Sequence, residues 1–214
     1  MITASPSTCQ AAAKYLLKID PVLAPIIKRA GVAPLTPHSN YYQSLVESII
    51  SQQLSVKAAA TILKRFLTLF PGADFPQPGQ ILEQDIETLR SVGLSRQKGA
   101  YIQDLAVKVI EKTVQFDHLD SLSNDEIIRE LTQIKGVGIW TVHMFLMFCM
   151  GRLDVLPVGD LGIKNGIFTL YGLTVKPTPD EIAATADKYQ WHPYASVASW
   201  YIWYSLDNKP AVSV

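Results

Sequence analysis

The stretch LTQIKGVGIWT, residues 131–141, decides the fold of this chain. An amphipathic pattern ends near Thr132, two glycines follow at positions 136 and 138, and an apolar helical pattern begins at once. Gly136 and Gly138 permit positive φ angles and a close approach of the backbone to another molecule. The stretch therefore predicts two helices joined by a tight hairpin.

The hairpin allows two interpretations. Both glycines sit where the second helix begins, and the exposed N–H groups and positive dipole end of a helix suit a phosphate oxygen. Lys135 would add a point charge beside them. The alternative is an ordinary helical turn that stops at a glycine. The carboxylate that follows about twenty residues later favours the phosphate-binding interpretation.

That carboxylate is Asp160, in LPVGDLGIK, residues 156–164. It follows Pro157 and Gly159 and precedes a helical run, residues 161–171. Aspartate is a common helix N-cap, so a purely structural role is one interpretation. The other is a carboxylate held at the mouth of a cleft, ionised by the helix N-terminus. The two roles are compatible, and the sequence leaves both open.

Helical periodicity dominates the remaining chain, and the fold class is predicted to be all-α with about eight to ten helices. One helix is expected from Pro78 to a point before Gly93. N-caps or capping boxes are expected at five positions, which are Asn40 with Gln43, Ser55, Ser95, Ser123 with Glu126, and Thr178 with Glu181.

Turn-forming residues cluster at 31–40 and 151–159 and divide the chain. We expect a central helical domain at 41–150, with the helix–hairpin–helix segment at about 123–150. Residues 1–40 and 151–214 would form a second, discontinuous helical domain.

Composition excludes several classes of protein. Lys and Arg number 19 and Asp and Glu number 19, so the formal net charge is zero and nucleic acid would have to be bound by a local patch. Two cysteines are too few for an iron–sulfur cluster, and zinc-ligand spacing is absent from the sequence. The longest apolar run, residues 139–150, is too short to span a bilayer, and the N-terminus lacks a signal-peptide pattern. We expect an intracellular protein, in the cytoplasm or nucleoid of a bacterium or the nucleus of a eukaryote.

Three segments together resemble a known family. The segments LVESIISQQLS (45–55), IKGVGIWT (134–141) and PVGD (157–160) occur in the same order as in the helix–hairpin–helix DNA glycosylases. The tryptophan in the hairpin is similar to that of the 3-methyladenine DNA glycosylase II branch, and the similarity runs from about residue 41 to 203. The resemblance implies two helical domains with a cleft between them, and a monomer that binds double-stranded DNA containing alkylated bases. Such enzymes flip an alkylated purine out of the duplex and hydrolyse its N-glycosidic bond, which leaves an abasic site.

The resemblance also assigns roles to single residues. Asp160 falls on the family's catalytic aspartate. The base pocket would be lined by Trp140, Trp203, Met144 and Tyr41, although each aromatic side chain is also a candidate for core packing. Contacts to DNA are expected from Gln53, which would plug the gap left by the flipped base, and from Lys135, Gly136, Val137, Gly138, Thr141 and Lys164. Arg96 and Lys98 match a family loop close to the DNA.

Trp140 falls where relatives with lyase activity carry a lysine. Without an amine there to form a Schiff base, a monofunctional glycosylase is expected. The family hairpin often binds a monovalent cation through backbone carbonyls, which here would be those of Thr132, Ile134 and Val137 and would hold Na or K. No other cofactor is expected.

Two other functions stay open from the sequence. One is a mismatch glycosylase that removes adenine or thymine, and the other is a non-catalytic helix–hairpin–helix module that only binds DNA. A single carboxylate near the reaction centre favours a base already activated by alkylation. Phe145, Phe148 and Trp200 are expected in the core, and His143 and His192 are expected to be structural.

Overall fold

A computed structural model describes residues 1–208 of the chain. Within this range there are twelve α-helices, one 3₁₀ turn and one π-helical segment. The β-structure recorded there is a single isolated bridge between Thr3 and Arg152. The all-α fold class is therefore confirmed.

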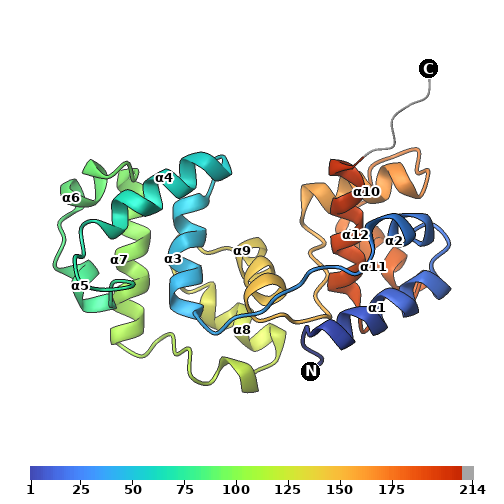
Figure 1. Cartoon of the computed structure of the whole chain (residues 1–214), viewed down its shortest axis with the longest axis horizontal. Coiled ribbons are helices and arrows are strands. Elements are labelled where there is room, and N and C mark those ends of the chain that lie inside the picture. Colours follow the sequence, from blue (N-terminus) through green and yellow to red (C-terminus); the bar gives the residue numbers. More distant parts are fainter. Residues whose placement is uncertain (209–214) are drawn as a thin grey trace. The chain divides into compact units, whose positions relative to one another are not determined.

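The helices follow one another along the chain in the order that Figure 1 labels. They are α1 (Pro6–Ile19), α2 (Ala24–Ala30), α3 (Tyr41–Ser51), α4 (Val56–Leu67), α5 (Pro78–Leu82), α6 (Ile86–Ser91), α7 (Arg96–Ile110), α8 (Asn124–Leu131), α9 (Ile139–Met144), α10 (Leu161–Leu170), α11 (Pro179–Lys188) and α12 (Ala195–Asp207). The 3₁₀ turn η1 spans Leu119–Ser121, and the π-helical segment η2 spans Phe145–Cys149.

The expected number of helices was too low. The single helix expected from Pro78 is two short helices, α5 and α6. The side chain of Asp85 accepts a hydrogen bond from the N–H of Thr88 and so caps a new helix inside the amphipathic pattern. Helices of five and six residues lie below the lengths on which the prediction rested.

Most of the expected caps are present. Ser123 with Glu126 and Thr178 with Glu181 form complete capping boxes, and Ser55 and Ser95 cap α4 and α7. The expected cap at Asn40 is wrong, although α3 begins directly after it: Asn40 makes no side-chain capping hydrogen bond. Gln43 instead donates to Glu47 at 2.8 Å, one turn further along the same helix.

The described chain divides into two compact units. Unit 1 is residues 1–38 with the segment from Leu146 onward, and unit 2 is Ser39–Phe145. The first boundary lies in the turn-rich segment 31–40, whereas the second lies inside the run of α9 and η2. The expected cleft between the domains stays a prediction.

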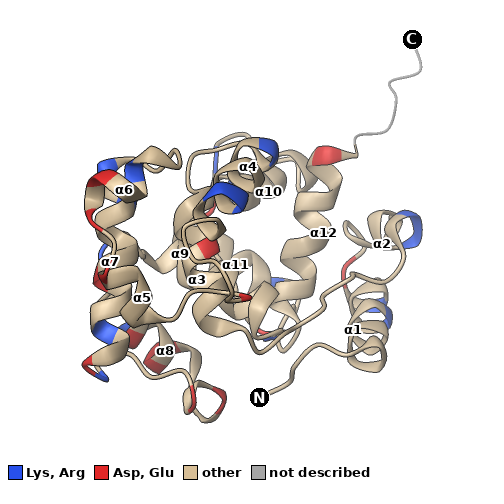
Figure 2. Ribbon diagram, turned by 60° about the vertical axis from the view of Figure 1, so that its left-hand side comes forward, with Lys and Arg blue, Asp and Glu red and all other residues tan. Residues whose placement is uncertain are grey.

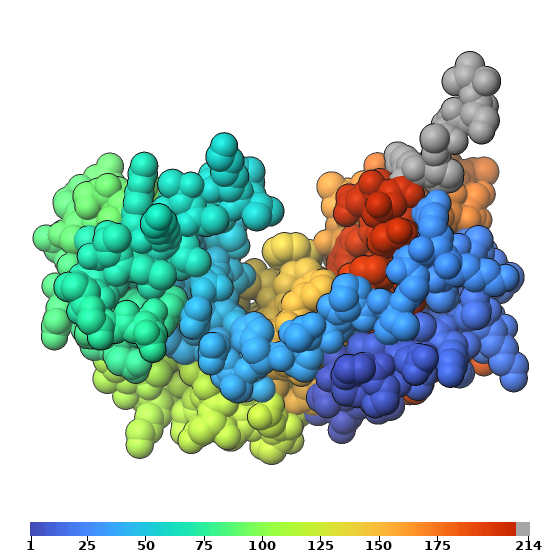
Figure 3. Space-filling view, in the orientation of Figure 1, coloured from blue at the N-terminus to red at the C-terminus, as the bar shows by residue number. Residues whose placement is uncertain are grey.

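Unit 1 is built from α1, α2 and α10–α12, so its core joins both ends of the chain. Leu16, Leu23, Ile167 and Tyr201 are fully buried in it, and α12 contacts α1, α2 and α10. Figure 3 shows the blue N-terminal residues packed against the red surface of α12. Burial of this shared apolar surface, worth about 25 cal/mol per Å², joins the two distant segments into one body.

Unit 2 is arranged around α7, which contacts α3, α5 and α6. Its core contains Leu45, Ile49, Phe66, Ile102 and Leu105, all fully buried. Leu45 and Ile49 lie four apart on α3, and Ile102 and Leu105 lie three apart on α7, so the periodicity in the sequence corresponds to the buried faces. In the described part of the chain, no helix combines the length and apolarity that crossing a membrane requires.

Candidate functional site

Asp160 caps the N-terminus of α10. Its Oδ1 accepts a hydrogen bond from the backbone N–H of Ile163 at 2.7 Å. The same oxygen accepts a second one from the indole Nε1 of Trp203, on α12, at 2.8 Å. The carboxylate is thus both the helix cap and a group oriented by a tryptophan. The cap is confirmed, whereas a place at the mouth of a cleft stays a prediction.

Gly162 provides the space for this arrangement. A Cβ atom at position 162 would lie 2.8 Å from Nε1 of Trp203 and 2.9 Å from Oδ1 of Asp160. Contacts that short are essentially absent between real side chains and their neighbours. Glycine is therefore required in the first turn of α10 if the indole is to reach the carboxylate.

Phe148 was expected in the core, but its side chain is 40% exposed, so that expectation is wrong. It belongs to the π-helical segment η2, whose altered pitch turns side chains away from the directions an α-helix would give them. The Phe148 ring lies 6.0 Å from the Trp203 ring at an angle of 34°. Leu161, next to Asp160, is also exposed, at 66%. Aromatic and apolar surface therefore lies on the residues around the carboxylate.

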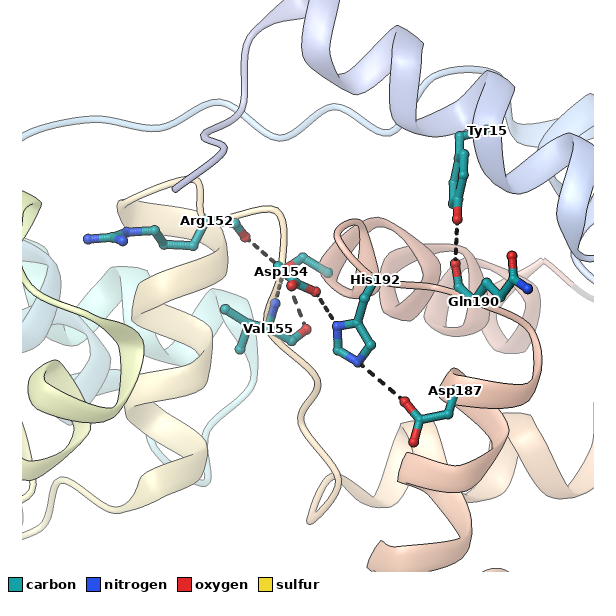
Figure 4. Close-up of polar contacts among 8 residues, drawn as sticks. Tyr15, Arg152, Asp154, Val155, Asp187, Gln190 and His192 are labelled. Carbon is teal, nitrogen blue, oxygen red and sulfur yellow. Dashed lines mark hydrogen bonds and ion pairs between the residues drawn. The ribbon is translucent and has the colours of Figure 1, made fainter.

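The start of the loop that carries Asp160 is held by α12 and the turn before it (Figure 4). Ser196 on α12 donates its hydroxyl proton to the carbonyl of Arg152 and accepts the N–H of Val155 at 2.9 Å. His192 Nδ1 lies 2.6 Å from Oδ1 of Asp154. These contacts assign His192 a structural role, as expected, and anchor the loop to the helix that bears Trp203.

The hairpin between α8 and α9 uses its two glycines differently. Gly136 has φ of +81°, in the left-handed region, whereas Gly138 is the extended N-cap of α9 with φ of −95°. A methyl group at Gly136 would collide with the Tyr101 ring on α7, but one at Gly138 would meet no atom within 4 Å. Gly136 is thus required by the fold, whereas Gly138 leaves the backbone open to an approaching molecule.

Lys135 at the hairpin has a partner that its sequence neighbours do not reveal. Its backbone N–H donates to Oδ2 of Asp104 at 2.9 Å, and its Nζ lies 3.3 Å from Oδ1 of the same carboxylate. The Lys135 side chain is nonetheless largely exposed. Its charge is partly offset, and its backbone N–H is already engaged.

Two residues expected at the DNA contact bury their side chains. Val137 is 3% exposed and Thr141 is 5% exposed. The DNA contact expected at these two positions stays a prediction, and the burial leaves little side-chain surface to make it. Their backbone groups remain candidates, since the N–H groups in the first turn of a helix have no partner within the helix.

The turn between α3 and α4 carries Gln53 at its tip, exposed and with φ of +57°. That conformation is uncommon for a residue other than glycine and is enriched at functional sites. The neighbouring Gln52 donates its Nε2 proton to the carbonyl of Gly136 at 2.8 Å. The turn and the hairpin are therefore directly connected by residues that lie 84 positions apart in the sequence.

The remaining expected residues have varied surroundings. Trp140 is 50% exposed on α9, and Met144 is half-buried at the end of that helix. Tyr41 donates its hydroxyl proton to Asp120 at 2.7 Å, and its ring packs edge-on against Phe145, which is buried as expected. Lys164 is half-buried on α10.

The structure thus brings the candidate residues together in two groups, one in each unit. In unit 1, Asp160 and Trp203 are in direct contact. In unit 2, the turn at Gln53 is connected to the hairpin. Among residues 1–208, no cluster of three or more His, Cys, Asp or Glu side chains is arranged to hold a metal ion.

Comparison with known proteins gives these two groups a context. The family model for the HhH-GPD superfamily base excision DNA repair protein matches residues 46–190. The alkylbase DNA glycosidase-like protein mag2 of Schizosaccharomyces pombe is 35% identical over 196 residues, which are 90% of this chain and 91% of that protein. DNA-3-methyladenine glycosylase 1 of the same organism is 37% identical over 163 residues, 76% of this chain and 71% of that protein.

Solved structures agree with the sequence comparisons. The 3-methyladenine DNA glycosylase of S. pombe in complex with abasic DNA superposes with a TM-score of 0.79 at 32% identity, covering 93% of this chain and 98% of that one. A DNA-3-methyladenine glycosidase from Bacillus halodurans gives a TM-score of 0.79 at 36% identity, covering 95% and 91%. The chain, with a helical hairpin in one unit and an aspartate-capped helix in the other, belongs to the HhH-GPD superfamily of base excision DNA repair proteins.

Proposed function

We propose that this protein is a DNA-3-methyladenine glycosylase, which flips alkylated purines out of duplex DNA and hydrolyses the N-glycosidic bond to leave an abasic site. The observation that carries this proposal is the Asp160 carboxylate, fixed by Trp203 and by the N-terminus of α10. The relatives named as 3-methyladenine DNA glycosylases, at 32–37% identity over most of the chain, support the substrate class.

The reaction needs only one acidic group when the base is alkylated. A purine methylated at N3 or N7 carries a positive charge, so it leaves as a neutral molecule when the C1′–N bond breaks and needs no proton. The sugar then develops oxocarbenium character, which a nearby carboxylate stabilises. Asp160 would also take the proton of the water whose oxygen bonds to C1′, so the products are the free base and an abasic site.

Selection of a cationic base is consistent with the aromatic side chains around Asp160. The faces of Trp203 and Phe148 are electron-rich and lie on the same unit as the carboxylate. Stacking of a desolvated cation on such a face is worth about 2 kcal/mol. An undamaged, neutral base would forgo most of that energy, so these aromatics would help to discriminate damaged from normal purines.

We assign binding of the DNA backbone to unit 2. The backbone around Gly138 is open, and the first turn of α9 begins there, so a phosphate oxygen would bind its N–H groups. Gln53 would fill the gap that the flipped nucleotide leaves in the duplex. Figure 2 shows Lys and Arg as short, separate segments of the ribbon, which fits a protein of zero net charge that relies on a few local contacts.

The carbonyls of Thr132, Ile134 and Val137 would hold a monovalent cation, Na or K, at the hairpin. Backbone oxygens are the ligands that hard cations prefer, and Gly136 turns the backbone sharply between two of them. Ile134 also accepts the N–H of Val137 at 3.0 Å, which keeps the turn tight. A cation there would add positive charge next to a bound phosphate. No other cofactor is required for the hydrolysis.

Strand cleavage is not part of this activity. Trp140 stands where lyase-active relatives carry a lysine, and an indole cannot form a Schiff base with C1′. Gels run without alkali should therefore show intact strands after base release, and borohydride should trap no covalent complex. Abundant nicking or trapping would overturn the monofunctional assignment.

The test uses methylated duplex DNA and measures free 3-methyladenine. The wild type should release the base, and Asp160→Asn should abolish release while it retains binding to DNA. Release of an unmodified base from a mismatch would instead indicate a mismatch glycosylase. Binding without release of any base would indicate a non-catalytic DNA-binding module, and either result would overturn the proposal.

A further inference from the structure

One face of α7 supports both the turn at Gln53 and the hairpin. Lys98, Tyr101 and Asp104 follow one another at intervals of three residues, so they form a stripe along the helix. Lys98 contacts the turn, Tyr101 lies beneath Gly136, and Asp104 binds Lys135. The two segments are far apart in sequence but share this one helix as their support.

The contact of Lys98 is specific. Its Nζ donates to the carbonyl of Ile50 at 2.8 Å and to that of Gln52 at 2.6 Å. These oxygens lie at the C-terminal end of α3, where the helix dipole favours a positive charge. Partial burial lowers the pKa of Lys98, and the two carbonyl acceptors compensate the ammonium for lost water. Two of the three ammonium protons of Lys98 are therefore donated to carbonyl oxygens within the protein.

Gln52 connects the two supported segments to each other. Its backbone carbonyl is held by Lys98, while its side-chain amide donates to the carbonyl of Gly136. Gly136 is in turn fixed against the Tyr101 ring, whose hydroxyl accepts a hydrogen bond from Gln97. The contacts form a closed path from α7 to the turn, from the turn to the hairpin, and from the hairpin back to α7.

We infer that Gln52 and Lys98 are positioning residues that hold the inserting side chain of Gln53 in a fixed register with the hairpin that binds the DNA backbone. The inference rests on the proposed function and deepens it. A hairpin bound to phosphates then places Gln53 at one defined base step, and the backbone of Gln53 is already in its unusual conformation before DNA arrives. Lys98 accordingly acts through the turn rather than as a phosphate contact.

The variants that test this remove hydrogen-bond donors and little else. Gln52→Glu keeps the shape but places a carboxylate against the Gly136 carbonyl, and Lys98→Met keeps the length but removes the ammonium. Matched controls lie on α7 itself. Gln103 makes the same kind of bond, from its Nε2 to the carbonyl of Gln84 at 2.8 Å, so Gln103→Glu is compared with Gln52→Glu. Lys108→Met is compared with Lys98→Met.

Three measurements are made on each variant. They are the affinity for an undamaged duplex, the affinity for a duplex with a tetrahydrofuran abasic analogue opposite 2-aminopurine, and the 2-aminopurine fluorescence of the bound complex. We expect Gln52→Glu and Lys98→Met to lose about tenfold in affinity for the abasic duplex, and the fluorescence change that reports insertion to shrink. Affinity for the undamaged duplex should change by less than about twofold, because the hairpin contacts remain.

A merely structural role would give another result. It would lower both affinities equally together with the melting temperature, and that outcome, or behaviour equal to the controls, would overturn the inference. Lys98→Arg retains hydrogen-bond donors and should keep part of the affinity that Lys98→Met loses. If Gln52→Glu does not fold, Gln52→Ala is measured in its place. If the wild type itself neither prefers abasic DNA nor releases 3-methyladenine, the proposed function is wrong. If the wild type does both and only the variants behave like their controls, the positioning role alone is wrong.

Discussion

The indole N–H of Trp203 donates to Oδ1 of Asp160 at 2.8 Å, although 43 residues separate them in the sequence. The same oxygen caps α10 by accepting the N–H of Ile163. Two donors on one oxygen fix the rotation of the carboxylate about its side-chain bonds, because turning it would break both hydrogen bonds. The carboxylate is thus oriented by the fold before any ligand is bound, which is the pre-organisation that the proposed function requires of it.

Trp203→Phe should lower the rate of base release more than it lowers DNA affinity. The phenyl ring keeps an aromatic face but lacks the N–H donor to the charged acceptor, and such a bond contributes about 2 kcal/mol, equivalent to roughly thirtyfold. Single-turnover release of 3-methyladenine measures the effect. Trp200→Phe is the control on the same helix, since that ring stacks on Tyr204. Equal rates in both variants would contradict the orienting role.

Gly162→Ala should reproduce that loss without touching either partner. The new Cβ would lie 2.8 Å from Nε1 of Trp203, so the indole must move away from Asp160. A misplacement of about 1 Å near the chemistry costs on the order of a hundredfold in rate. Gly159→Ala is the control, because a Cβ there meets no atom within 4 Å. An unchanged rate in Gly162→Ala would show that the carboxylate does not need the indole.

Gly138→Val should weaken binding to duplex DNA of any sequence while it leaves the melting temperature nearly unchanged. Its φ of −95° is accessible to other residues, and the space beside it is open, so only an approaching backbone would be obstructed. Gly136→Val should instead destabilise the protein itself, because it strains a positive φ and collides with Tyr101. Anisotropy titrations and thermal melts separate the two effects. Tight binding by a stable Gly138→Val would exclude a phosphate contact there.

Asp20→Asn should destabilise unit 1 by about 3 kcal/mol. The buried Asp20 carboxylate accepts four hydrogen bonds, from the N–H groups of Val22 and Leu23, the hydroxyl of Tyr171 and the indole of Trp191. An amide turns one of its two acceptor atoms into a donor and leaves buried protons without a partner. Urea unfolding measures the change. The exposed Asp187 offers a control in Asp187→Asn, and equal stability of the two variants would contradict this account.

Stability should fall as the pH rises from about 10 toward 12. Burial raises the pKa of Tyr201 to about 12 from an ordinary value of 10, and burial also raises the pKa of Tyr42 and Tyr171. In this window the unfolded chain loses phenol protons that the folded chain keeps. The free energy of unfolding therefore falls by about 1.4 kcal/mol per pH unit for each such group. Urea unfolding at pH 9, 10 and 11 measures the slope. Tyr201→Phe should make it shallower, and an identical slope would mean that Tyr201 titrates normally in the folded protein.

The features that the sequence predicted are those that neighbouring residues determine. The hairpin at Gly136, the caps at Ser123 and Thr178 and the cap at Asp160 all depend on side chains within a few residues of the backbone groups they serve. Local spacing therefore contained enough information to place them. The prediction of a single helix from Pro78 was wrong because the amphipathic periodicity continues across the local cap that separates α5 from α6.

The contacts that support the candidate site are between distant residues and could not be predicted. Gln52 and Gly136 are 84 residues apart, and Lys135 and Asp104 are 31 apart. Phe148 was misplaced because a π-helical segment changes which face a residue occupies, and its sequence fits an ordinary apolar helix equally well. Supporting residues are ordinary amino acids whose roles arise only from packing.

The discontinuous construction of unit 1 has a consequence for synthesis on the ribosome. Helices α1 and α2 emerge before unit 2, whereas α12, which contacts both of them, emerges after it. Every residue of unit 2 is translated in between, so that unit can assemble while Leu16 and Ile27 still lack their core. Helices α1 and α2 thus wait for their native neighbours until all of unit 2 has been made, and nascent-chain chaperones would meet them in that interval.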